Sequence, residues 1–191
     1  MIPRERGFVT DRPIPCHASD AAGFLPGPLG LRLDEAFLPL AALSGPAQAL
    51  DALLPIGETR QVAATLYLRF APSSVMVSGP LPDGPFTAVD VGHGLTRFRL
   101  RGVEALHFLG HYNSADLHAA PIRRARAIRT GINHFDTALW WPNTRDVHIL
   151  VERSLAQSFA DHLRALALRH DPADPSLTPR PVAPDAPDRR G

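Results

Sequence analysis

The sequence predicts an α+β protein with small antiparallel or mixed sheets and helices packed on one face. Two patterns carry this prediction. Apolar and polar residues alternate at the period of a half-buried strand in several segments, most clearly in 62–70, 95–101 and 147–151. Apolar residues recur at helical spacing in 103–109 and 155–166. The chain has 191 residues, 45% of them hydrophobic, which is enough for one domain with its own core.

Proline, glycine and the loss of periodicity divide the chain into three parts. Residues 1–30 are rich in Pro and Gly, which predicts an extended N-terminal arm with little structure of its own. Residues 31–170 are predicted to form a single α+β domain, with a front lobe at 31–83 and a main lobe at 84–170. Residues 171–191 consist mostly of Pro, Ala, Asp and Arg, which predicts a disordered or extended tail.

The front lobe is expected to contain one short helix and a pair of strands. Residues 31–38 predict the start of a strand or a helical turn. Pro46 suits the first position of a short helix, because its missing N–H needs no partner there, and Pro55 ends that helix. The alternation in 61–70 predicts a strand, and 75–77 predicts a second strand that returns after a turn.

Two further strands are expected around the turn at 92–94. Residues 86–91 are apolar on both faces apart from two positions, which predicts a strand inside a sheet. Residues 95–101 predict a strand with two different faces. Those expected to point into the core are Thr96, Phe98 and Leu100, and those on the opposite face are Arg97, Arg99 and Arg101.

The C-terminal half of the main lobe is predicted to alternate between helix and strand. A short helix is expected at 103–109, followed by strands at 125–132, 135–141 and 147–151. Ser154 and Gln157 have the spacing of a capping box, which marks the start of a long helix. The apolar face of that helix is formed by Leu155, Phe159, Leu163 and Leu166.

Composition excludes several classes of partner. The formal net charge is +1, so no overall field directs the chain to nucleic acid or to an anionic membrane. All basic residues are Arg, which genomic base composition explains most simply, with docking through planar guanidinium groups as the alternative.

Cys16 is the only cysteine, so no internal disulfide can form. With no signal-type or membrane-spanning apolar run, a cytoplasmic location is expected.

Several segments resemble the gamma subunit of heterotetrameric sarcosine oxidase. They are 89–96 (Val-Asp-Val-Gly-His-Gly-Leu-Thr), 99–102 (Arg-Leu-Arg-Gly), 105–109, 115–118 (Ala-Asp-Leu-His) and 147–154 (Val-His-Ile-Leu-Val-Glu-Arg-Ser). The wider relatives are the folate-dependent aminomethyltransferases of the glycine cleavage system. The resemblance implies an aminomethyltransferase-like fold with a ferredoxin-like βαββα core.

The resemblance implies a non-catalytic accessory subunit that works beside alpha, beta and delta subunits. Such complexes oxidise the N-methyl group of sarcosine and pass the one-carbon unit to tetrahydrofolate. FAD, FMN, NAD and tetrahydrofolate are then expected in other subunits, and no cofactor in this chain. The segments 110–114 and 121–124 depart from the family pattern, which leaves sarcosine or a related N-methyl amine open as the substrate. A stand-alone folate-binding or aminomethyl-transferring protein is the alternative, and an unrelated scaffold is a weaker third reading.

The candidate partner interface consists of arginine and tryptophan side chains, which are enriched where proteins bind one another. A solvated surface is the competing reading for the arginines, and core burial is the competing reading for the tryptophans. Alternation along 135–141 allows only one tryptophan to point inward. The residues assigned to this interface are Trp140, Trp141, Arg145, Arg97 and Arg99, with Arg123, Arg124, Arg126 and Arg129 as further members of a positive surface.

No catalytic, cofactor-binding or metal-binding residue is predicted. His107 and His111 have the i, i+4 spacing of two metal ligands on one helix face, but no third ligand is recognisable. Asp90 and His93 are interpreted as parts of a tight turn, with a ligand contact as the alternative. Cys16 has no base nearby in the sequence and is interpreted as a free thiol.

Overall fold

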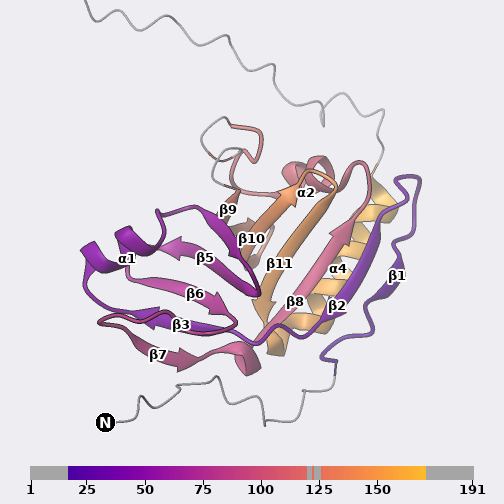
Figure 1. The fold of residues 1–191 in the computed structure, drawn as a ribbon. Helices are drawn as coiled ribbons and strands as arrows, with labels where there is room; N and C mark the ends of the chain where they lie inside the picture. Colours follow the sequence, from indigo (N-terminus) through magenta and orange to yellow (C-terminus); the bar gives the residue numbers. More distant parts are fainter. Residues whose placement is uncertain (1–16, 120–121, 123–125, 171–191) are drawn as a thin grey trace, which may run out of the picture.

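Two antiparallel sheets organise the computed structural model, which describes residues 17–119, 122 and 126–170. Figure 1 shows them side by side. The larger has the order β1 (Ala22–Phe24), β2 (Arg32–Ala36), β8 (Leu95–Arg101), β11 (Asp146–Glu152), β10 (Phe135–Asn143) and β9 (Ala127–Ile132). The smaller has the order β4 (Thr59–Val62), β5 (Thr65–Ala71), β6 (Ser74–Ser78), β3 (Ala41–Ser44) and β7 (Thr87–Asp90). The α-helices of the described part are α1 (Ala47–Leu53), α2 (Ala105–Tyr112) and α4 (Ala156–Arg169). The predicted α+β class is confirmed.

Helices α2 and α4 pack on the same face of the larger sheet. Phe98 of β8 points into this layer and is fully buried, as are Phe108 of α2 and Phe159 and Leu163 of α4. Burying such a side chain contributes about 1.5–3 kcal/mol before the loss of chain entropy is counted. Phe98 comes from the alternating pattern of β8, so the face predicted to be apolar is the one that the helices cover.

The smaller sheet has its own apolar cluster, which includes α1. Its fully buried members are Leu43, Leu50, Leu54, Val75 and Val77. Arg69 of β5 lies beside this cluster and is only 1% exposed. Its Nη1 donates to the carbonyl oxygen of Leu54 at 2.7 Å and contacts Asp51 at 2.7 Å, and its Nη2 donates to the carbonyl oxygen of Pro72 at 2.9 Å. Arg69 thereby ties the end of α1 to the turn after β5.

The smaller sheet is inserted between two neighbouring strands of the larger one. β2 and β8 are hydrogen-bonded, with Ala36 opposite Arg97, while β3 to β7 lie between them in the sequence. The sheets therefore do not follow the predicted lobes, 31–83 and 84–170, because β2 lies in the larger sheet and β7 in the smaller one. A third cluster joins the sheets, formed by Leu40, Leu68, Ala127, Trp140 and Leu150.

The described part of the N-terminal arm packs on the domain. Residues 22–24 form an edge strand, and Ala21 and Leu25 are buried in the main core, so the expectation of little structure is wrong for this part. Glu35 accepts hydrogen bonds from the backbone N–H groups of Ala18 and Ser19 at 2.7 and 2.8 Å.

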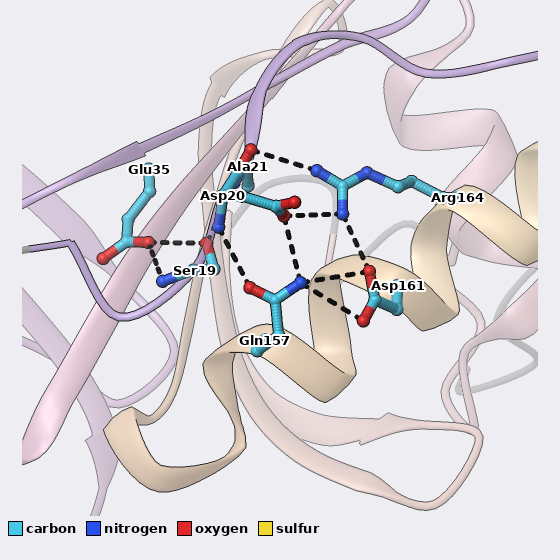
Figure 2. A network of polar contacts seen from close by, with 7 residues as sticks. All are labelled: Ser19, Asp20, Ala21, Glu35, Gln157, Asp161 and Arg164. Carbon is cyan, nitrogen blue, oxygen red and sulfur yellow. Dashed lines mark hydrogen bonds and ion pairs between the residues drawn. The ribbon is translucent and has the colours of Figure 1, made fainter.

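Asp20 continues the same network toward α4 (Figure 2). Its backbone N–H donates to Gln157, and its carboxylate accepts from Gln157 and Arg164 at 3.0 and 2.8 Å. The arm is thus held against both a strand and a helix.

Two strands differ from their prediction. β7 is the edge strand of the smaller sheet and its residues are exposed, whereas 86–91 was expected inside a sheet. The predicted strand at 61–70 is divided into β4 and β5 by a turn in which Ala63 has a φ of 49°. The four residues of this turn, Val62 to Thr65, include none of the usual turn-forming types, so the sequence does not indicate a turn there.

In the C-terminal half of the domain, the observed elements agree more closely with those predicted from the sequence. The strands expected at 125–132, 135–141 and 147–151 are β9, β10 and β11, and the long helix is α4. Three strands therefore separate α2 from α4, one more than in a ferredoxin-like βαββα core. No side-chain cap forms at the start of α4, since Gln157 bonds Asp20 instead of closing a capping box. Leu155 lies before the helix and is 40% exposed, in contrast to the expected burial.

Within the residues that the structure describes, no helix is both long and apolar enough to cross a membrane. Cys16, Arg123, Arg124 and the tail at 171–191 lie outside the described residues.

Candidate functional site

The predicted interface residues are divided between the protein surface and its interior. Arg97 and Arg99 point away from the helices on the outer face of β8 and are half-buried, and Arg145 is exposed in the turn before β11. Trp140 and Trp141 are 4% and 2% exposed. Alternation allowed only one inward tryptophan, but the smaller sheet covers the second face of β10 and buries both.

A cavity of about 620 Å³ opens where β4 and β5 approach the outer face of the larger sheet. It contains three of the predicted interface residues, Arg97, Trp140 and Trp141. Its full lining is Glu58, Thr59, Gln61, Leu66, Arg97, Arg126, Trp140, Trp141, Pro142 and His148. The volume lies within the range of roughly 300–1,000 Å³ that is typical of small-molecule pockets.

The three arginines of β8 have different partners. Arg99 makes a bidentate pair with Asp146, at 2.8 and 2.6 Å, and Arg101 donates to Asp34 at 2.5 Å. Arg97 makes no ion pair with a described residue, and its Nε is buried without a hydrogen-bond partner there. Burial, followed by the charge of Arg99, lowers the pKa of the Arg97 guanidinium below its usual value. Arg97 is therefore a cation at the cavity that lacks its own anion among these residues.

His148 and Trp140 form a flat aromatic pair beside Arg97. The two residues face each other across β11 and β10, and their rings are stacked at 4.7 Å with an angle of 10° between their planes. Burial lowers the pKa of His148 to about 4, and the nearby guanidinium groups of Arg97 and Arg99 act in the same direction. The carboxylate of Asp146, 3.7 Å away, opposes this shift. His148 is accordingly neutral at physiological pH.

The remaining charged groups of the cavity are Arg126 and Glu58, which meet at an isolated β-bridge between the two sheets. Arg126 has a φ of 63° and donates through Nη1 to the carbonyl oxygen of Pro142 at 2.9 Å. With two arginines, one glutamate and a neutral histidine, the lining carries one net positive charge. The lining contains no Ser, Cys or Lys side chain.

The other residues considered in the sequence have local roles. The Nε2 atoms of His107 and His111 lie 3.1 Å apart, and burial lowers the pKa of His111 to about 4. No group of three or more His, Cys, Asp or Glu side chains suited to a metal occurs among the described residues. The carboxylate of Asp90 accepts from the backbone N–H of Gly92 at 3.0 Å, as expected of a tight turn, although Asp90 is exposed rather than buried.

Sequence reasoning missed His148, Glu58 and Gln61 as neighbours of the arginines. For His148 a signal was present, because it alternates with buried residues in β11 and shares the outer face of the sheet with Arg99. For Glu58 and Gln61 no local signal exists, since the inserted sheet brings them to the cavity.

The fold is that of an α+β chain with a cavity between two antiparallel sheets. No family model and no curated protein sequence matches this chain. Among solved structures it is similar to a chain of "Heterotetrameric Sarcosine Oxidase from Corynebacterium sp. U-96 in complex with pyrrole 2-carboxylate", with a TM-score of 0.62 and 20% identity. The match covers 78% of this chain and 90% of that chain. At this identity the likeness establishes a shared fold.

Proposed function

We propose that this chain is a non-catalytic accessory subunit of a sarcosine-oxidase-like flavoenzyme complex. The observation that carries the proposal is the extent of the fold match, which includes 90% of one chain of a heterotetrameric sarcosine oxidase. The sequence segments 89–96 and 147–154, which resemble the gamma subunit of that family, support it independently.

In this proposal the chain takes the gamma position beside alpha, beta and delta subunits. The complex oxidises the N-methyl group of sarcosine or a related amine and passes the one-carbon unit to tetrahydrofolate. FAD, FMN, NAD and tetrahydrofolate belong to the other subunits, and the complex is cytoplasmic.

The surface proposed to meet the partner lies along the outer end of β8 and the turn before β11. Arg145 is exposed there, and Arg99 is half-exposed beside it. Arg97 and Trp140 lie at the cavity and Trp141 lies in the helix-covered core, and all three are proposed to support this surface from beneath.

Purification of the tagged full-length chain from its source cells tests the proposal. We expect large flavin-containing polypeptides in fixed ratio to the chain, and a flavin absorbance that bleaches when sarcosine or another N-methyl amine is added. The substitution Arg145→Glu should reduce the recovery of these polypeptides, whereas Arg169→Glu, at an exposed arginine in the last turn of α4, should not. Recovery of the chain alone, without flavin, would contradict the proposal.

The alternative reading, a stand-alone folate-binding or aminomethyl-transferring protein, predicts a different result. The isolated chain would then bind tetrahydrofolate in a calorimetric titration without any other subunit. We expect no heat of binding in that titration.

A further inference from the structure

We propose that the cavity between the sheets binds a small aromatic molecule with one carboxylate group, which pairs with Arg97. This ligand site is independent of whether the chain joins a larger complex. It is carried by three observations: a guanidinium without an anion, an aromatic lining, and a net charge that matches a single carboxylate.

The first observation concerns Arg97. The Nε atoms of Arg97 and Arg101 are both buried without a hydrogen-bond partner among the described residues, but of the three arginines of β8 Arg97 alone also lacks an ion pair there. Its neighbours Arg99 and Arg101 each have a carboxylate, from Asp146 and Asp34, and both of those carboxylates are engaged by the arginines that they serve. Arg97 faces the cavity with a planar group that can hold a carboxylate through two parallel hydrogen bonds.

The second observation concerns the aromatic side chains of the lining. The indole ring of Trp140, which belongs to the apolar cluster between the sheets, lines the cavity, and the ring of His148 is stacked on it. Aromatic rings prefer offset-stacked or edge-to-face partners, and such pairs contribute about 0.5–1.5 kcal/mol beyond the area that they bury. Leu66 and Pro142 complete an apolar wall, so the part of the ligand beyond the carboxylate is expected to be an uncharged ring system.

The third observation is the charge of the lining. Arg97 and Arg126 contribute two positive charges, Glu58 contributes one negative charge, and His148 is neutral at physiological pH. One net positive charge suits a monoanion. A nucleotide phosphate chain would bring several negative charges toward Glu58, and the lining includes no glycine-rich loop to hold it.

The size and position of the cavity favour a free small molecule over a single side chain of another protein. A volume of about 620 Å³ is far larger than an aspartate or glutamate side chain needs. Thr59 and Gln61 of β4 line the cavity from the smaller sheet, so a ligand there meets polar residues of both sheets. Sites between two packed structural units are common places for small ligands.

A titration of the full-length chain with 2-naphthoate, and in parallel with the neutral 2-naphthamide, tests the proposal. The chain has two tryptophans. Trp140 lines the cavity and the side chain of Trp141 is buried in the helix-covered core, so in a ¹H–¹⁵N spectrum the indole N–H signal of Trp140 reports on the site and that of Trp141 is an internal control. We expect 2-naphthoate to shift the indole signal of Trp140 saturably, with a smaller shift for Trp141, and to bind about tenfold or more tightly than 2-naphthamide.

Variants separate the role of Arg97 from general hydrophobic binding. Arg97→Met should weaken the binding of 2-naphthoate by about tenfold or more and leave the affinity for 2-naphthamide unchanged. Arg97→Lys should bind 2-naphthoate with an intermediate affinity. Arg129→Met, at an exposed arginine outside the cavity, should bind as the wild type does. Absence of saturable shifts in the wild-type chain, equal affinity for the two probes, or an unchanged affinity of folded Arg97→Lys and Arg97→Met would each overturn the proposal.

Discussion

The imidazole ring of His148 lies parallel to the indole ring of Trp140, with an angle of 10° between their planes and 4.7 Å between their centres. The contact joins β11 to β10 at paired positions. Because the imidazole ring is largely buried there, its neutral form is favoured, and the stability of the protein therefore depends on pH.

Acidification should destabilise the protein through His148. Its pKa is lowered to about 4 in the folded chain, against about 6.5 when unfolded, so between these values the unfolded chain binds a proton that the folded chain does not. The free energy of unfolding should therefore rise with pH between about 4 and 6.5 and be constant above. For this partly exposed group, we expect an effect on the order of 2 kcal/mol. Urea unfolding of the wild type and of His148→Phe, which keeps an aromatic ring, measures it, and the variant should lose this part of the pH dependence.

The ion pair between Arg99 and Asp146 should contribute to stability and hold the pKa of His148 up. Asp146→Asn removes a half-buried partner of a bidentate contact, and we expect a loss of about 1–2 kcal/mol in the free energy of unfolding. Since the Asp146 carboxylate raises the pKa of His148, that pKa should fall further in the variant, as followed by NMR. Asp136→Asn is the matched control. It breaks an exposed pair with Arg129 and should cost less than about 0.5 kcal/mol.

Arg69→Met should be among the most destabilising substitutions in the smaller sheet. It leaves the buried carbonyl oxygen of Leu54 and that of Pro72 without their donor, and we expect a loss of about 2–4 kcal/mol. Thermal and urea unfolding measure the loss. Arg129→Met, at an exposed site, should change stability by less than about 1 kcal/mol, and an equal effect of the two substitutions would contradict the anchoring role.

Gly27→Ala should disturb the contact between the arm and α4. Gly27 has a φ of 99°, and an added Cβ would overlap the carbonyl oxygen of Ala167, a backbone atom that cannot rotate away. Gly23 has a φ of 123° but open space around it, so Gly23→Ala carries the conformational cost alone. We expect Gly27→Ala to be the more destabilising of the two by about 1 kcal/mol or more in urea unfolding. Equal losses would show that the overlap is relieved by a shift of the chain.

Elements with strong local patterns could be predicted from the sequence. In β8 the alternation around Phe98 fixes both the strand and the face that meets the helices, and the same holds for β11 and for Phe159 and Leu163 in α4. β7 could not be placed correctly, because its position at an edge depends on pairing with β3, more than forty residues earlier in the chain. Its apolar composition resembles that of a central strand although the structure leaves it exposed.

The cavity was only partly accessible to prediction. Arg97, Trp140 and Trp141 were singled out for their chemistry, and they do lie together. Their burial could not be foreseen, because it is caused by the smaller sheet, which packs on the face of β10 that a single-sheet reading leaves open to water. The special position of Arg97 likewise depends on Asp34 and Asp146, which are distant in sequence and neutralise its two neighbours.

The chain leaves the larger sheet after Ala36 and returns to it opposite that residue, at Arg97. The two ends of the inserted sheet thus emerge from neighbouring strands, where a tight turn of about two to five residues would be sufficient to connect them as a hairpin. The cavity owes its second wall to that insertion. A shortened chain with β2 and β8 joined directly would keep the helix-covered sheet and lose Glu58, Thr59 and Gln61 along with the inserted strands. The two walls of the cavity are therefore encoded in separable stretches of this sequence, one in the larger sheet and one in the insertion.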